Sequence, residues 1–543
     1  MEANSMRKLL GSSTMRTISF AACLMALPLI IMLSVNYQDQ MFNLIGKVKV
    51  LGGQALNVRQ IGSEHEPASI SDDVLLGGLL ASEFDKDSCL SRSEAVLYRK
   101  PSSKKPSPYL ISKLRNYENL HKRCGPDTES YKRTLLVLDS RNISSTTECN
   151  YIVWTAQAGL GNRILTIASA FLYALLTDRV LLVEFNADMT DLFCEPFPNT
   201  SWLLPPNFPK QFRKFNQWNA DTLGNTLKNN VFNASSELLP SHLYIFLAYG
   251  LTNFDMLFYC EEHHALLQKA PWLVLRSDEY FIPSFFLMPS FQQELDKMFP
   301  DKESVFHHLG RYLFHPSNKA WGLITRFYQS YLAKSDERIA MQIRVFNPNA
   351  KPFQRVMDQI LACTLQENLL PEVDKQRLVA SPSKNQTSKS VLIASLYPQF
   401  YENMTNMYWT FPTRKGEVIG VYQPSHEEYQ HFGDNMHNVK AWVEMNLLSL
   451  SNVLVTSSGS TFGYVAQGLG DLRPWILYRP ENWKDSDAAC HPGKSMEPCL
   501  HIPPSHDCKA KRNFDMGTVV PYVKHCEDST SGLKLINPDN NSR

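Results

Sequence analysis

The sequence has no excess of charge of either sign. Its 54 lysines and arginines nearly balance its 53 aspartates and glutamates, which gives a formal net charge of +1. No basic stripe with interleaved aromatic residues occurs, so we exclude nucleic acid as a partner. The remaining composition, 43% hydrophobic and 20% charged, is that of a globular protein. At 543 residues the chain is long enough for two or three domains.

Three motifs of common metal and cofactor sites are missing or incomplete. No two cysteines have the C-x-x-C spacing of zinc or thioredoxin-like sites. Asp-x-Asp occurs at 85–87 and 485–487, but neither copy follows an apolar strand, as a metal-dependent transferase requires. The glycine-rich stretch at 159–161 has Ile164 in the third glycine position of a dinucleotide fingerprint, where that side chain is too bulky. We therefore expect neither a metal nor NAD.

A charge-free apolar run is the first positive feature of the chain. Residues 17–35 would form roughly 28 Å of helix, close to the thickness of a bilayer core. Arg7, Lys8 and Arg16 precede the run, which puts the N-terminus in the cytosol. The alternative, a cleaved signal peptide, has a shorter apolar region and a small-residue cleavage site. We expect a cytosolic tail at 1–16, a transmembrane helix at 17–35 and a lumenal stem at 36–86.

Cysteines and glycosylation sequons agree with a lumenal body. Of eleven cysteines, Cys23 lies in the apolar run, which leaves an even number downstream. Cys490, Cys499 and Cys508 are too widely spaced for zinc, so disulfides are the better interpretation. N-x-S/T sequons, which are typical of secreted proteins, occur at Asn142, Asn199, Asn233, Asn385, Asn403 and Asn540.

Two stretches show the strand–helix alternation of α/β folds. The first predicts a helix at 163–178 and strands at 151–154, 179–185 and 272–278. The second predicts strands at 338–346, 391–397, 417–423, 452–456 and 474–480, with helices at 352–370, at 438–450 and from Phe462. We therefore predict two Rossmann-like domains, at 87–330 and 331–543, that face one cleft at the carboxyl ends of their strands.

Two of the predicted strand ends carry residues suited to a phosphate or a sugar. In the loop at 159–163, Gly161 lets backbone amides approach a ligand, while Asn162 and Arg163 add polar groups. A tight structural turn is the alternative for this loop. Arg344, near the end of 338–346, can hold a diphosphate through two parallel hydrogen bonds. A buried ion pair explains Arg344 equally well when its strand is considered alone.

A hydroxyl-rich loop favours the phosphate interpretation. The stretch 456–461 reads TSSGST, follows an apolar strand and leads into a helix with Ser460 or Thr461 as its N-cap. Hydroxyls together with a helix N-terminus form an anion site that needs no metal. Plain capping is the alternative, but it requires only one of these hydroxyls.

Several acidic and histidine residues are candidates for proton transfer or substrate contacts. Asp278 ends a strand beside Glu279, where an acid would reach the cleft; a cap or a salt bridge is the alternative. The residues at 426–428, His-Glu-Glu, follow a later strand and are candidates for ribose, base or acceptor contacts. We expect the histidine pairs at 263–264 and 307–308 on helix surfaces.

Long segments of the chain resemble the plant xyloglucan fucosyltransferase family. They are GLGNRILTIASAFLYALLTDRVLLVEF (159–185), DMTDLFCEPFPNTSWLLP (188–205), QIRVF (342–346), PFQRVMDQILACTL (352–365) and VTSSGSTFGYVAQGLGDLRPWILY (455–478). The similarity extends from about residue 87 to the end, in unchanged order. It implies a type II Golgi enzyme with a variant GT-B fold. Such enzymes transfer fucose from GDP-β-L-fucose, with inversion and without a metal, typically to O2 of galactose or arabinose.

The resemblance also implies roles for particular residues. Arg344 matches the arginine that holds the GDP diphosphate, and Asp278 matches an acidic position important for activity. The general base is left open. We expect GDP-fucose contacts from Arg344, Ser457, Ser460, Thr461, Phe462 and His426, with Gly161, Asn162 and Arg163 beside the cleft.

Departures from the family pattern leave the acceptor open. Gly470-Asp471 stands where a Gly-Gly pair is expected, and 425–435 diverges. The expected partners are GDP-fucose, a xyloglucan or arabinogalactan glycan and the Golgi membrane, and a homodimer is left open. The alternative is a lumenal glycan-binding protein on a decayed transferase fold, against which the intact Arg344 argues.

Overall fold

The computed structural model describes residues 74–138, 142–143, 147–231, 239–345, 353–377, 379, 386–479, 483–484, 487–504, 506–508, 512–513 and 515–538. All of them belong to one compact unit, Ala68–Arg543. The predicted tail and transmembrane helix, and the predicted stem as far as residue 73, lie outside the described residues. So do the side chains of Asn142, Asn233, Asn385 and Asn540.

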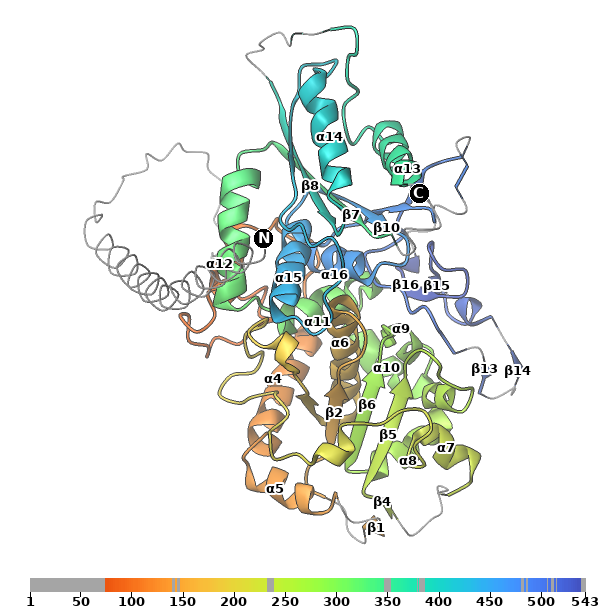
Figure 1. Ribbon diagram of the computed structural model, residues 1–543. Helices are drawn as coiled ribbons and strands as arrows, with labels where there is room; N and C mark the ends of the chain where they lie inside the picture. The colour runs from red at the N-terminus through yellow and green to blue at the C-terminus, as the bar shows by residue number, and fades with distance from the viewer. Residues whose placement is uncertain are drawn as a thin grey trace, which may run out of the picture. The chain divides into compact units, whose positions relative to one another are not determined.

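The first sheet is parallel and buried on both faces (Figure 1). Its strands, in spatial order, are β3 (Val180–Val183), β2 (Tyr151–Thr155), β6 (Trp272–Ser277) and β5 (His242–Leu247). Tyr151 is aligned with Val180 on one side and with Trp272 on the other. The three predicted strands are confirmed. Strand β5 was not predicted.

Helix α6 (Leu160–Thr177) connects β2 to β3 and forms the centre of the core. It begins after Gly159 and ends at Asp178, which adopts the left-handed conformation (φ 49°) common after helix ends. Within the described part of the chain, α6 is the helix whose length and composition would also suit a membrane span. Because 78% of its apolar window is buried, it is a core helix.

The second sheet has five parallel strands and an antiparallel edge. In spatial order the strands are β12 (Cys490–Pro492), β11 (Trp475–Leu477), β10 (Val453–Ser457), β7 (Glu337–Ile343), β8 (Ser388–Ser395) and β9 (Val418–Tyr422). Four helices belong to this part of the chain, namely α13 (Phe353–Gln366), α14 (Gln399–Thr410), α15 (Asn435–Ser449) and α16 (Thr461–Gly470). The predicted alternation is confirmed. Strand β12 and helix α14 were not predicted.

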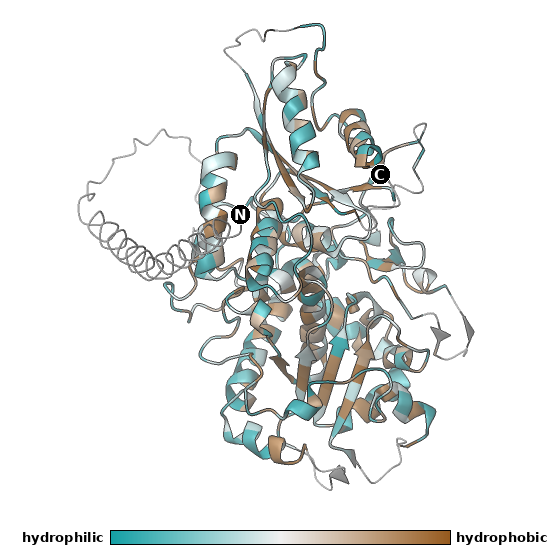
Figure 2. Cartoon of the chain, in the orientation of Figure 1, coloured by the Kyte–Doolittle hydropathy of each residue, from teal (hydrophilic) through white to brown (hydrophobic). Residues whose placement is uncertain are grey.

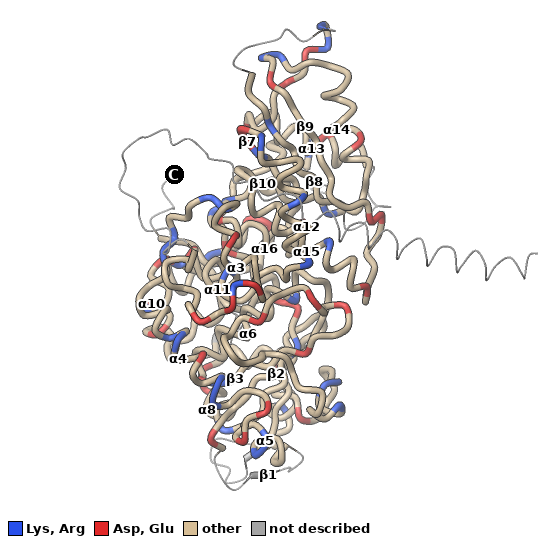
Figure 3. The backbone as a smooth tube through the Cα atoms, turned by 90° about the vertical axis from the view of Figure 1, so that its left-hand side faces the viewer, with Lys and Arg blue, Asp and Glu red and all other residues tan. Residues whose placement is uncertain are grey.

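Helices α6, α11, α15 and α16 pack against one another between the two sheets (Figure 1). Hydrophobic residues predominate in the strands of the first sheet and in α6, whereas α14 is largely polar (Figure 2). Lysines and arginines are interspersed with acidic residues along the described chain, in line with the small net charge (Figure 3). The predicted division near residue 330 falls in a π-helical turn, Tyr328–Leu332, which precedes β7. The domain limits themselves stay a prediction.

Shorter elements complete the described fold. The remaining helices are α3 (Leu90–Glu94), α4 (Pro108–Cys124), α5 (Glu129–Leu136), α7 (Leu223–Lys228), α8 (His264–Lys269), α9 (Ile282–Phe285), α10 (Pro289–Met298), α11 (Val305–Leu313) and α12 (Asn318–Phe327). Three two-stranded ribbons pair β1 (Asn142–Ile143) with β4 (Leu239–Pro240), β13 (His506–Asp507) with β14 (Arg512–Asn513), and β15 (Val523–His525) with β16 (Leu533–Leu535).

The folded body begins earlier than the predicted stem boundary at residue 86. Leu79 and Leu80 are 1% and 3% exposed and belong to the main core. The guanidinium of Arg115 donates to the carbonyl oxygen of Leu79 at 2.8 Å. The expectation for the histidine pairs was also wrong, because His264, His307 and His308 are buried.

Disulfides pair all ten cysteines downstream of the apolar run. The bonds are Cys89–Cys194, Cys124–Cys149, Cys260–Cys508, Cys363–Cys490 and Cys499–Cys526. This confirms disulfides, and not zinc, as the role of Cys490, Cys499 and Cys508. Such a set of bonds persists in an oxidising compartment.

Candidate active site

A cavity of about 490 Å³ lies at the carboxyl ends of β7 and β8. The rest of its wall is formed by the first turns of α6 and α16, one side of α15, the segment 425–432 and His501. In a parallel α/β sheet this edge is where ligands bind. Six of the predicted site residues line the cavity, namely Gly161, Asn162, Arg344, Ser460, Thr461 and Phe462.

The N-termini of α6 and α16 meet at the cavity. Thr461 Oγ1 donates a hydrogen bond of 2.9 Å to Asn162 Oδ1. A Cβ atom on Gly161 would lie 2.8 Å from Thr461 Oγ1 and 2.9 Å from the backbone carbonyl carbon of Thr461. Glycine is therefore required at 161 for the close approach of the two helices. Both helix N-termini present backbone N–H groups, and a partial positive charge, to the same space.

We expect Gly161→Ala to lower the stability of the protein. Alanine in a helix gains about 1 kcal/mol over glycine, but the clash with the backbone of Thr461 costs about 1–3 kcal/mol and forces the helices apart. Thermal unfolding measures the effect. Gly159→Ala is the matched control, because its Cβ would meet only the flexible side chain of Gln430, at 3.3 Å. Equal midpoints for the two variants would contradict this account.

The helix that starts at Thr461 leaves its capping hydroxyl free for other bonds. Ser460 is the N-cap, as predicted, but its side chain accepts no hydrogen bond from the first turn of α16. Ser460 is buried, at 5% exposure, and faces the cavity. Plain capping therefore does not account for this hydroxyl, which supports the anion-site interpretation.

Arg344 directly follows β7. Its backbone N–H donates to Ser457 Oγ at 2.9 Å, and Ser457 is the last residue of the neighbouring strand β10. The guanidinium Nη2 donates to Gln430 Oε1 at 3.2 Å. The amide oxygen of Gln430 thus helps to orient the guanidinium. Ser457 is not part of the cavity wall, so its hydroxyl acts by fixing the backbone of Arg344.

Asp278 directly follows β6 and is connected to the cavity through Asn162. Its carbonyl oxygen accepts a 2.9 Å hydrogen bond from Asn162 Nδ2, and its Oδ2 accepts from the backbone N–H of Tyr249 at 3.2 Å. Within the described residues, the buried Oδ1 has no hydrogen-bond donor. Burial raises the pKa of Asp278 above its ordinary value. Asp278 itself is not part of the cavity wall.

Glu279 has a different environment from that of its neighbour. Burial and the adjacent charge of Asp278 raise the pKa of Glu279 to about 7. Its Oε2 accepts hydrogen bonds from the backbone N–H groups of His501 and Ile502, at 2.9 and 3.3 Å. Glu279 therefore holds the C-terminal segment against the first sheet, and His501 reaches the cavity wall.

Two predicted contact residues, Arg163 and His426, adjoin the cavity in sequence but are not part of its wall. Arg163 forms a buried ion pair with Asp188 at 2.8 Å and donates to the carbonyl oxygen of Ala158. His426 is exposed, and its ring packs edge-on against Tyr401. Ligand contacts by Arg163 and donor binding by His426 stay predictions.

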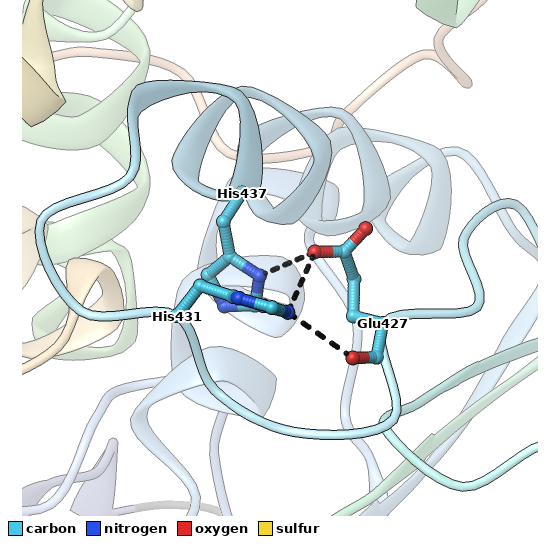
Figure 4. A group of neighbouring side chains, drawn as sticks. All are labelled: Glu427, His431 and His437. Carbon is cyan, nitrogen blue, oxygen red and sulfur yellow. Dashed lines mark hydrogen bonds and ion pairs between the residues drawn. The ribbon is translucent and has the colours of Figure 1, made fainter. Parts of the chain in front are cut away.

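A charged cluster on the divergent segment 425–435 and the start of α15 was not predicted as a unit. Figure 4 shows the rings of His431 and His437 next to each other and facing Glu427, with His437 Nδ1 at 2.8 Å from the carboxylate. Lys440 forms an ion pair with the same carboxylate. Partial burial raises the pKa of Glu427, but hydrogen bonds from Lys440 and His437 outweigh that effect and hold the pKa below its ordinary value.

The three side chains in Figure 4 have the donor set of a divalent cation site, with ligand atoms within 4.8 Å of one another. The Lys440 ammonium already neutralises the carboxylate, as a cation would. We therefore interpret the cluster as an ion-pair network that forms one wall of the cavity.

A buried acid on α15 also faces the cavity. Burial raises the pKa of Glu444 to about 8, and its Oε1 accepts a 2.5 Å hydrogen bond from Ser425. At neutral pH its carboxyl group is therefore mostly protonated and can donate a hydrogen bond to a ligand. Sequence patterns gave no signal for Glu444, because only the packing of α15 brings it to this wall.

Comparisons with known proteins agree with this geometry. Residues 53–509 match the family described as xyloglucan fucosyltransferase. The galactoside 2-alpha-L-fucosyltransferase of Arabidopsis thaliana is 52% identical over 536 residues, which cover 97% of this chain and 94% of that protein. The protein of the same name from Pisum sativum is 55% identical over 479 residues, which cover 88% and 84%.

A solved structure agrees as well. An arginine-to-lysine mutant of Arabidopsis thaliana FUT1, in complex with GDP, is 56% identical in sequence. It superimposes with a TM-score of 0.80 and covers 85% of this chain and all of that one. The chain is therefore a glycosyltransferase that belongs to the xyloglucan fucosyltransferase family.

Proposed function

We propose that this chain transfers L-fucose from GDP-fucose to O2 of a galactose on xyloglucan. The observation that carries the proposal is the convergence of Arg344, the N-terminus of α16 and the Gly161-Asn162 turn on one cavity. The names of the two plant relatives supply the donor sugar, the linkage and the galactoside acceptor. An arabinose of an arabinogalactan is the alternative acceptor.

The second sheet holds the donor in this proposal, and the first sheet holds the acceptor. This arrangement is the variant GT-B fold, with the cavity between two Rossmann-like halves. Arg344 forks onto the diphosphate, and the N–H groups at the start of α16 meet the same charge. Negative charge develops on GDP as the bond to fucose breaks, so these groups stabilise the transition state more than the ground state.

The acceptor hydroxyl attacks C1 of fucose from the side opposite GDP, which inverts the configuration. Asp278 orients this hydroxyl, directly or through a water molecule, and accepts its proton. Its buried Oδ1 has the open acceptor capacity that this role needs. Asn162 is hydrogen-bonded to both Asp278 and Thr461, and so fixes the position of Asp278 relative to the donor site.

We expect fucose transfer to persist in excess EDTA, because fixed positive groups of the protein replace a divalent cation at the leaving group. The full-length chain in detergent, GDP-fucose and a galactose-terminated xyloglucan oligosaccharide are sufficient for the assay. Activity lost in EDTA and restored by Mn²⁺ would favour a metal-dependent mechanism instead.

The location we propose is the Golgi membrane, with residues 17–35 as a signal anchor and the catalytic body in the lumen. The five disulfides support an oxidising compartment. Asn199 and Asn403 are exposed, as glycosylated asparagines must be. A homodimer stays a prediction.

A further inference from the structure

A second cavity, of about 210 Å³, lies on the other side of α15 and α16 from the donor cavity. It is formed where both helices end, at Ser449 and Gly470, together with α11 and the segment 99–102. Its volume is several times the ~30 Å³ that a water molecule occupies in the liquid. No sequence motif and no part of the proposed reaction accounts for it.

Positive charge dominates the wall of this cavity. Four cationic side chains line it, those of Arg99, Lys100, Arg311 and Arg473, against the single carboxylate of Asp471. Arg473 is already paired with Glu303 at 2.8 Å, outside the wall. The carboxylate of Asp471 accepts a 2.7 Å hydrogen bond from the Ser102 hydroxyl.

A neutral histidine holds one of these arginines in place. His307 Nδ1 lies 2.7 Å from the carbonyl oxygen of Gly468, so this nitrogen carries the proton and donates. Its Nε2 is therefore the acceptor for Arg311 Nη1, at 3.0 Å. Burial, and then the charge of Arg311, hold the pKa of His307 well below its ordinary value. His307 thus orients Arg311 without adding charge.

Arg99 is half-buried and lines the cavity close to Arg311. Burial, and then the charge of Arg311, lower its pKa well below the ordinary value, and no carboxylate opposes the shift. Within the described residues, no hydrogen bond or ion pair of its guanidinium is recorded, although that group has five N–H donors. The C-terminal dipoles of α15 and α16 attract cations to this place, but they do not supply directed acceptors to Arg99.

Arg179 is a buried arginine of the same molecule whose guanidinium finds all its acceptors within the protein. It is 1% exposed, and its guanidinium donates to the carbonyl oxygens of Ala270, Leu267 and Gln268 at 2.8, 2.6 and 3.2 Å. Arg99 has no such set of carbonyls. The Arg99 guanidinium is half-buried beside a second guanidinium and has no protein acceptor among the described residues, and an anion in the cavity supplies one.

We propose that this cavity is a second anion site, which binds a phosphate-type oxyanion through Arg99, Arg311 and Lys100. Helices α15 and α16 both extend from the donor cavity to this second cavity. An anion bound here fixes their C-terminal ends, while other residues of the same two helices line the donor cavity. The anion is not a substrate and does not compete with GDP. The proposal does not depend on the fucosyltransferase reaction.

The test is thermal unfolding of the full-length protein in detergent, with inorganic phosphate as the probe and ionic strength held constant with chloride. Phosphate raises the unfolding midpoint, and saturating GDP adds its own increase. Arg99→Gln weakens phosphate binding roughly 10- to 100-fold, as expected for lost charge-assisted hydrogen bonds, but keeps the increase caused by GDP.

Two further measurements separate an anion site from a structural role of Arg99. Without phosphate, Arg99→Gln unfolds at the same or a higher temperature than the unaltered protein, because it removes repulsion from Arg311. Asp471 has a left-handed backbone (φ 53°), which asparagine also adopts readily. Asp471→Asn therefore removes the one carboxylate in the cavity wall without backbone strain, and we expect it to tighten phosphate binding. Any of three results would overturn the proposal: no stabilisation by phosphate, an unchanged phosphate response in Arg99→Gln, or loss of the phosphate effect when GDP is saturating.

Discussion

Replacing Arg344 by lysine will reduce the affinity for GDP roughly 100-fold, which corresponds to about 2.7 kcal/mol. Arginine holds a diphosphate through two parallel hydrogen bonds, each worth about 1.5–3 kcal/mol when charged groups are involved. Lysine keeps the charge but loses the fork. It also cannot keep the contact with Gln430, which lies 3.2 Å from Arg344 Nη2. Titration calorimetry with GDP, in EDTA, measures the change.

Arg163→Lys is the matched control for this experiment. Arg163 lies in the first turn of α6, close to the cavity in sequence, but its guanidinium is paired with Asp188. We expect this variant to lose some stability and to bind GDP with nearly normal affinity. Nearly normal GDP binding by Arg344→Lys would remove Arg344 from the donor site.

Replacing Asp278 by asparagine will lower kcat by a factor of about 10²–10⁴, the usual contribution of a positioned acid or base, while GDP affinity stays within about twofold. Asparagine keeps the size of the side chain and the hydrogen bond from the Tyr249 N–H. It removes only the ability to accept a proton. Steady-state kinetics with both substrates saturating measure the effect.

The pH dependence of Asp278 gives an independent test. Burial raises its pKa, so the active carboxylate is lost at a higher pH than for an ordinary aspartate as the solution is acidified. The rate should therefore fall on the acidic side, and the Asp278→Asn variant should lack this limb. Glu279→Gln is the control, because the Glu279 carboxylate accepts backbone hydrogen bonds from His501 and Ile502 and so has a structural role. A nearly normal kcat in Asp278→Asn would exclude the proposed proton transfer.

Those parts of the site that lie at the ends of strands and the starts of helices could be predicted from the sequence. Gly161 was expected in the loop before a helix, Thr461 at a helix start and Arg344 near a strand end, because hydrophobic periodicity locates such boundaries. The helix begins three residues earlier than predicted, at Leu160, so Gly161 lies in its first turn. These positions meet at one cavity, since parallel strands bring their carboxyl ends to one edge of the sheet.

Side-chain direction could not be predicted, because it depends on tertiary packing. Arg163 was expected beside the cleft, and its ion pair with Asp188, 25 residues away in sequence, could not be predicted; a ligand contact by Arg163 stays a prediction. Ser457 was expected to contact the donor; its hydroxyl accepts a hydrogen bond from the backbone N–H of Arg344, and the donor contact stays a prediction. His307 and Glu444 were missed for the same reason: each lies on a helix whose inner face is defined only by its neighbours.

The central claim is tested most directly by one transfer experiment. The full-length chain is incubated in EDTA with GDP-fucose and a galactose-terminated xyloglucan oligosaccharide, and the linkage in the product is determined by NMR. We predict one α-linked fucose on O2 of galactose. Binding of GDP and of the glycan without any transfer of fucose would contradict the account and indicate a glycan-binding protein on a transferase fold.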